Sequence, residues 1–145
     1  MRGIECIFPN PKALFRFLEA CRQEITNCFI YVLDQAAYYC GKRICLPEKI
    51  RHDEISLWVD RLLVFERLVL HIYPPNAQCS TIDTYNDFLK SECQFLVLIY
   101  DGVFLEIYTK NSNTATVLYN NAGLCGALEV TIKTDDTDLR RELFV

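Results

Sequence analysis

The stretch FLVLIYDGVFLEIYTK, residues 95–110, is the most strongly patterned part of the chain. Two apolar runs flank the dipeptide Asp101-Gly102, and these two residue types tolerate the positive φ angles of a tight hairpin turn. The stretch therefore predicts an antiparallel β-hairpin with a two-residue turn. The expected pairs are Tyr100 with Val103, Ile99 with Phe104, Leu98 with Leu105, Val97 with Glu106, Leu96 with Ile107 and Phe95 with Tyr108.

This register also predicts what each face of the hairpin carries, because side chains alternate between the two faces of a strand. One face is apolar apart from a phenol and has to be buried; it carries Leu96, Leu98, Tyr100, Val103, Leu105 and Ile107. The other face carries a single carboxylate, and its members are Phe95, Val97, Ile99, Phe104, Glu106 and Tyr108.

The apolar composition of the second face can be explained in two ways. A sheet covered on one side only would alternate polar and apolar residues, so this face is either covered by the rest of the chain or offered to a partner. Cover is favoured, because exposed apolar patches of this size are uncommon on monomers. The Glu106 carboxylate also has two possible roles. It could have a raised pKa and act as an acid or base, or, more commonly for such a residue, it could lie at the rim of the sheet and pair with Lys or Arg.

Hydrophobic periodicity and capping residues predict the other elements. Expected strands are Arg2–Phe8, Ile25–Leu33, Phe65–Tyr73 and Leu128–Lys133, the last with Glu129, Thr131 and Lys133 facing outward. Helices are expected from Asn10-Pro11, which buries Leu14, Phe17, Leu18 and Cys21; from Asp53, with Ile55, Trp58, Val59 and Leu62 at helical spacing; from Thr84, where Asp87 completes a capping box; and from about Thr114 to Ala122, ended by Gly123. The tail TDDTDLRRELFV reads as a charged turn followed by a last strand.

The order of these elements indicates the fold class. From Phe65 onward it is strand, helix, strand, strand, helix, strand, which is the order of a ferredoxin-like split unit. We expect an α+β fold with a mainly antiparallel sheet and covering helices. No linker or repeat divides residues 1–145, so a single globular domain is expected; within residues 34–52 only a turn at Gly41-Lys42 is predicted.

The composition limits which classes of partner and which cellular compartment are expected. The net charge is −4, from 19 acidic and 15 basic residues, which disfavours nucleic acid and anionic membranes and favours a basic protein partner. The start of the chain reads as lacking a secretory signal, and no apolar run approaches the roughly 20 residues that span a bilayer. A cytoplasmic protein is expected, with its eight cysteines reduced and with Cys6, Cys21 and Cys28 as small buried side chains.

A search for catalytic and ligand motifs finds no common template. Nucleotide-binding, hydrolase and zinc spacings are absent, so no cofactor or metal is expected. His71 with Cys79 or Cys93 could form a cysteine-dependent site, although eight cysteines and two histidines allow such combinations by chance. The acidic run from Asp135 to Asp138 is read as a solvated turn neutralised by the arginines that follow.

Three segments resemble a known family: MRGIECIFPN, IDTYNDFLKSECQFLVLIYDG and KTDDTDLRRELFV. The chain is similar here to small uncharacterised bacterial proteins that open with MRGI and a Pro-Asn and end with a Thr-Asp-rich turn and an Arg. The segment around Phe65 and the segment from Cys40 to Cys45 match less well. That family is a domain of unknown function, so the resemblance implies no catalytic residue.

These observations lead to three hypotheses on function. The first is a non-enzymatic protein-interaction domain, specifically an inhibitor or immunity-type partner of a toxin or effector. The second is a small-ligand-binding or sensory domain with a pocket between sheet and helices near Phe95, Glu106 and Tyr108. The third and least favoured is a cysteine-dependent enzyme. The expected interaction residues are Phe95, Phe104, Glu106, Tyr108, Asp135, Asp136 and Asp138, while the oligomeric state is not predicted.

Overall fold

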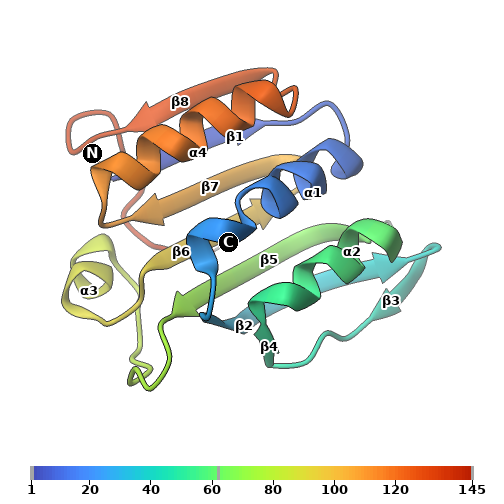
Figure 1. The fold of residues 1–145 in the computed structure, drawn as a ribbon, viewed down its shortest axis with the longest axis horizontal. Helices are drawn as coiled ribbons and strands as arrows, with labels where there is room; N and C mark the ends of the chain where they lie inside the picture. The colour runs from blue at the N-terminus through green and yellow to red at the C-terminus, as the bar shows by residue number, and fades with distance from the viewer. Residues whose placement is uncertain (1, 62, 145) are drawn as a thin grey trace.

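The structure, a computed structural model, describes residues 2–61 and 63–144 (Figure 1). Its strands are β1 (Gly3–Ile7), β2 (Phe29–Tyr39), β3 (Lys42–Ile44), β4 (Lys49–Arg51), β5 (Val64–Tyr73), β6 (Phe95–Tyr100), β7 (Phe104–Thr109) and β8 (Glu129–Lys133). Its α-helices are α1 (Pro11–Ala20), α2 (Ile55–Arg61), α3 (Tyr85–Lys90) and α4 (Ser112–Leu124). Short 3₁₀ turns lie at Arg22–Ile25 and His52–Glu54.

All the described strands belong to one antiparallel sheet. Their order is β3-β2-β5-β6-β7-β1-β8, and β4 pairs with β2 on the same edge as β3. The predicted α+β class and the element order from β5 to β8 are confirmed. The strand pairing differs from a split unit, since β5 and β6 are direct antiparallel neighbours and the N-terminal strand β1 lies between β7 and β8.

The sheet has one thickly covered face and one partly covered face. Helices α1, α2 and α4 pack on the first, which we call the helix face (Figure 1); its core includes Leu14, Trp58 and Leu118. On the opposite face a smaller core contains Phe88 of α3, Ile82 and Leu143. We call this the tail face, because the C-terminal segment, residues 134–144, contributes to its cover.

Local capping signals are confirmed where both partners are close in sequence. The side chain of Asn10 accepts a hydrogen bond from the Ala13 amide, with Pro11 in the first turn of α1. Thr84 and Asp87 form the expected capping box at the start of α3. These caps satisfy amides that have no partner inside the helix.

Several element boundaries differ from those predicted. Residues 22–25 form a 3₁₀ turn, so the second strand begins at Phe29 and continues to Tyr39; the following turn is Cys40-Gly41 rather than Gly41-Lys42. The segment at Asp53 is a second 3₁₀ turn that leads into α2, and the predicted position Leu62 lies outside the described residues. Helix α4 passes through Gly123 to Leu124, and the C-terminal segment forms no strand within residues 134–144.

The predicted hairpin exists, but its register was wrong by one residue. Tyr100 pairs with Phe104, so Asp101, Gly102 and Val103 form a three-residue loop in which the first two have positive φ. A shift of one residue moves every side chain of one strand to the other face. Glu106, Phe104 and Tyr108 therefore share the tail face with Leu96, Leu98 and Tyr100, and the helix face carries Phe95, Val97, Ile99, Leu105 and Ile107.

Candidate functional site

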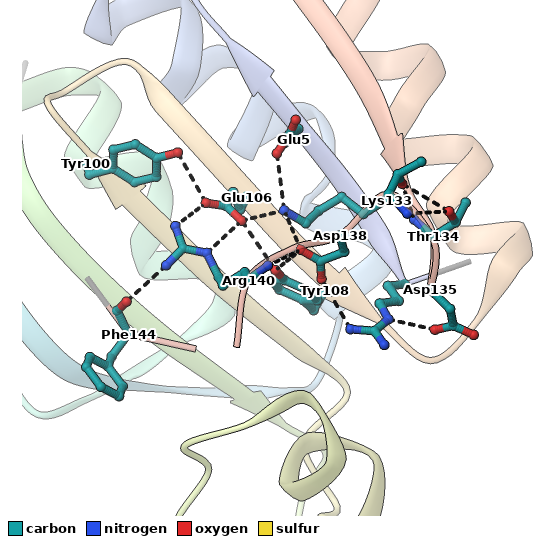
Figure 2. Close-up of polar contacts among 12 residues, drawn as sticks. Glu5, Tyr100, Glu106, Tyr108, Lys133, Thr134, Asp135, Asp138, Arg140 and Phe144 are labelled. Carbon is teal, nitrogen blue, oxygen red and sulfur yellow. Dashed lines mark hydrogen bonds and ion pairs between the residues drawn. The ribbon is translucent and has the colours of Figure 1, made fainter. Parts of the chain in front are cut away.

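Glu106 of β7 is the centre of a charged cluster on the tail face (Figure 2). The Arg140 guanidinium donates to both carboxylate oxygens, with Nη2 at 2.5 Å from Oε1 and Nε at 3.0 Å from Oε2. The ammonium of Lys133 lies 2.6 Å from Oε2, and the Tyr100 hydroxyl donates to Oε1 at 3.1 Å. Glu106 is thus saturated with donors from its own chain.

Electrostatics keep this cluster ionised. Burial alone would raise the pKa of Glu106, but hydrogen bonds from Arg140 and Lys133 outweigh it and lower the pKa below its ordinary value. Burial lowers the pKa of Lys133, and the contact with Glu106 more than reverses this effect. The acid or base role considered for Glu106 needs a raised pKa, so the paired explanation is the one that the geometry supports.

The same cluster fastens the C-terminal segment to the sheet. Asp138, whose side chain is 1% exposed, lies 3.3 Å from the Lys133 ammonium and 3.4 Å from an Arg2 nitrogen. Arg2 also donates to Asp135 at 2.6 Å. Lys133 was expected to face outward and is instead buried, because Asp138 and Glu106 lie over it. The cover over Glu106 is therefore supplied by the chain's own C-terminal segment, whereas the residues predicted to share a face with this carboxylate are divided between the two sides of the sheet.

The seven expected interaction residues fall into three environments. Phe95 is buried on the helix face, opposite the rest. Glu106, Tyr108 and Asp138 are buried on the tail face, and Asp135 is held by Arg2. Three of the expected residues face solvent: Phe104, which is half-buried, and Asp135 and Asp136, which are exposed.

Part of the tail face has no helix over it, where β7, β1 and β8 lie side by side. Phe104 stacks on Tyr100 with ring centroids 5.2 Å apart and an angle of 2° between the planes. In the sheet register Phe104 adjoins Ile7, which adjoins Glu129; in the next row Glu106 adjoins Glu5, which adjoins Thr131. We call this the open face, and its members are Glu5, Ile7, Tyr100, Phe104, Glu129 and Thr131.

The open face surrounds a shallow hollow of about 170 Å³. A second hollow of about 450 Å³ adjoins it at Glu5 and is bordered by Leu139, which is 88% exposed. Only Phe104 of this surface was predicted. The sequence does show alternating positions in each strand, Glu5 and Ile7 in one and Glu129 and Thr131 in the other. Only the long-range pairing of β1 with β7 and β8 brings them onto one surface.

The cavity between the sheet and the helices is small, and of the three residues predicted to line a pocket there it contains only Phe95. The cavity there, lined by Phe95, Leu70 and Leu118 among others, has a volume of about 30 Å³, which is close to that of one water molecule. Within residues 2–61 and 63–144, no group of three or more His, Cys, Asp or Glu side chains is placed to hold a metal ion.

Comparisons with known proteins give the family. Residues 59–144 match the family described as "Protein of unknown function (DUF2691)". The uncharacterized protein YncE of Bacillus subtilis (strain 168) is 34% identical over 152 aligned residues, which cover 99% of each chain. The chain belongs to this DUF2691 family. The predicted resemblance to uncharacterised bacterial proteins is confirmed, and no solved structure matches the chain.

The DUF2691 match includes the buried cluster but only part of the open face. Glu106, Lys133, Asp138 and Arg140 lie inside the matched region, whereas Glu5 and Ile7 of β1 lie before it. Among the described helices, none is both long and apolar enough to cross a membrane.

The cysteines of this DUF2691 member are free thiols. Cys6 and Cys21 are buried as expected, Cys28 is half-buried, and burial raises the pKa of Cys6, Cys21 and Cys93 to about 12. Cys93 donates its S–H to the Phe95 carbonyl, and it is a poor nucleophile because burial keeps its pKa high. Cys79 is exposed and lines one cavity together with His71.

Proposed function

We propose that this protein is a non-enzymatic interaction domain that binds an extended, basic segment of another protein on its open face. The supporting observation is the half-buried Tyr100–Phe104 stack on an uncovered part of the sheet, flanked by the exposed carboxylates of Glu5 and Glu129. Aromatic faces with acidic neighbours attract Arg and Lys side chains through both charge and cation–π contacts.

The chain itself contains an example of the proposed contact. The guanidinium carbon of Arg140 lies 5.9 Å from the centroid of Tyr100, while Arg140 also pairs with Glu106. A partner's arginine would take the same kind of position at Phe104, with Glu129 in place of Glu106. Glu5, whose carboxylate is bound by Lys133 at 3.1 Å, would add to the negative charge nearby. The net charge of −4 would add long-range attraction to a basic partner.

The specific proposal is an inhibitor or immunity-type role against a basic toxin or effector. Such a role needs no catalytic residue and uses a rigid, preformed surface. We propose a cytoplasmic location, which is supported by the eight free thiols. Nucleic acid and membrane are not the proposed partners.

The proposal is tested by site-specific photocrosslinking in the native bacterium. A photoreactive phenylalanine analogue at position 104 is expected to give a protein adduct of defined mass. The same analogue at Val117, which is exposed on α4 across the sheet, is the matched control. A partner that crosslinks equally at both positions, or absence of an adduct at position 104, would contradict the proposal.

The identified partner then allows a quantitative test. Phe104→Ala should weaken binding by about tenfold or more, as expected for a central aromatic contact. The double variant E5Q/E129Q should weaken binding several-fold and reduce its dependence on salt, because two exposed charges are lost. Val117→Ala should bind like the wild type. Binding that is unchanged in F104A and E5Q/E129Q would refute this location of the interface.

A further inference from the structure

A larger cavity lies elsewhere on the tail face, between strands β2 and β5 and the segments 79–83 and 143–144. Its volume is about 580 Å³, within the range of about 300 to 1,000 Å³ that is typical of small-molecule sites. Val69, Ile82 and Phe144 give it apolar walls, and Asp34, His71 and Asp83 supply polar groups. The open face does not share these residues.

His71 is an unpartnered polar group at this cavity. Its side chain comes from the middle of β5 and is 5% exposed, and none of the hydrogen bonds among the described residues involves either ring nitrogen. Burial lowers the pKa of His71 to about 4, so the imidazole is neutral at pH 7. A neutral imidazole keeps one nitrogen as a hydrogen-bond acceptor and the other as a donor.

The charges around the cavity have one sign. Asp34 and Asp83 are the only residues with a formal charge among those that line it. The Asp34 carboxylate is bound by the Arg67 guanidinium at 2.6 Å, whereas the side chain of Asp83 is exposed and lies in no ion pair recorded among the described residues. Because Arg67 already neutralises Asp34, the carboxylate that would attract a cationic group and repel an anion is that of Asp83.

One wall of the cavity is fixed by the C-terminal segment. The Leu143 amide donates to the Asp83 carbonyl at 2.8 Å, and the Phe144 carbonyl accepts from Arg140 at 3.1 Å. Since Arg140 is also bound to Glu106, the wall is connected to the buried charge cluster (Figure 2). This wall is thus held in place by the chain itself, so ligand binding need not order it.

We propose that this cavity binds a small primary amine that carries an apolar body about the size of one ring. The ammonium group lies near Asp83 and donates a hydrogen bond to the free nitrogen of His71. The apolar body packs on Val69, Ile82 and Phe144. This inference does not depend on the proposed protein partner.

The two histidines allow a direct test by NMR. In protein labelled with ¹⁵N, the imidazole signals of His71 and His52 are distinguished with the variant H52Q. Titration with 2-phenylethylamine should shift the His71 signals saturably and leave those of His52 unchanged. The probe 3-phenylpropionate has a similar size and the opposite charge. Its affinity should be lower by a factor of about ten or more. No saturable shift of His71, or equal affinity for the two probes, would overturn the proposal.

Variants separate the polar contacts from the apolar ones. D83N, at an exposed carboxylate, should weaken amine binding several-fold, while D136N, at an exposed carboxylate outside the cavity, should leave it unchanged. H71F should bind the amine about tenfold more weakly; because its imidazole signals are gone, binding is followed through the backbone amide signal of Val69. H71Q retains a hydrogen-bond acceptor and should lose less affinity. If H71F does not fold, H71Q and D83N still decide the matter; unchanged amine binding in both would refute the assigned contacts.

Discussion

The ammonium group of Lys133 lies 2.6 Å from the carboxylate of Glu106, and the exposed fractions of the two side chains are 6% and 3%. The pair joins β8 to β7, two strands that β1 separates in the sheet. Arg140 completes it from the C-terminal segment. One buried carboxylate therefore holds three parts of the chain together.

Replacing Glu106 by Gln should be strongly destabilising. The variant leaves Lys133 without its closest partner in a buried position, and removing one member of a buried ion pair costs about 3 to 5 kcal/mol. Urea denaturation followed by circular dichroism measures the free energy of unfolding. The matched control is Asp53→Asn, which breaks the exposed pair with Arg51 and should cost less than about 1 kcal/mol. Equal losses in the two variants would show that the buried cluster is not a major source of stability.

His71 should make the protein less stable in mild acid. The unfolded chain takes up a proton near pH 6.5, but burial lowers the folded pKa to about 4. Stability is therefore full above pH 6.5 and falls as the pH drops toward 4, by up to about 3 kcal/mol. The variant H71F should show a flatter pH dependence in this window, and H52Q should keep the slope of the wild type. A slope that H71F leaves intact would mean that another group titrates.

Gly3 should be hard to replace. A Cβ atom at this position would lie 1.8 Å from the Ile107 carbonyl oxygen, so Gly3→Ala has to displace β1 from β7. We expect a loss of about 3 kcal/mol or more in the free energy of unfolding. Gly123→Ala is the control, since nothing lies within 4 Å of its Cβ position in α4 and a helical Ala should stabilise by about 0.5 to 1 kcal/mol. Thermal unfolding should therefore move in opposite directions for the two variants.

The eight thiols should react at very different rates. Iodoacetamide should label Cys40, Cys45 and Cys79 first, because these three are exposed. Cys6, Cys21 and Cys93 are buried, with pKa values raised to about 12, and should react only after unfolding. Peptide mass spectrometry over a time course measures each site. Fast labelling of Cys93 in the native state would contradict the geometry of β6 and its surroundings.

Local signals allowed much of the fold to be predicted from sequence. Asn10-Pro11 and the pair Thr84 and Asp87 act within one helical turn, so no distant residue alters them. The element order after β5 followed from periodicity in the same way. The pairing of β1 with β7 and β8 could not be predicted, because it joins residues about one hundred or more positions apart and no local pattern specifies it.

The hairpin register failed for a different reason. Both faces of the hairpin are buried, so the apolar pattern fits a two-residue turn and a three-residue loop equally well. The side chain of Glu106 decides between them in the folded protein, since only the observed register brings it to Lys133 and Arg140. A three-residue loop with Gly at a position of positive φ is itself a common hairpin connection.

The candidate sites were predicted only in part, because their cover and many of their neighbours are distant in sequence. The sequence predicts that Lys133 and Asp138 are solvated. Their side chains are buried only because the C-terminal segment folds back onto the sheet. The open face draws Ile7, Phe104 and Glu129 from three separate strands. The cavity at His71 similarly needs the segments 79–83 and 143–144 to meet over β5.

The position of β1 also constrains how the chain reaches its native state. The first strand of the chain can complete its pairing only when the last strand, β8, has been synthesised, so the sheet closes late and through contacts of long sequence separation. Such contacts slow folding, since the loop entropy is lost before the pairing energy is gained. During translation, both edges of β1 stay unpaired until β7 has been synthesised, and one edge stays unpaired until β8 has followed.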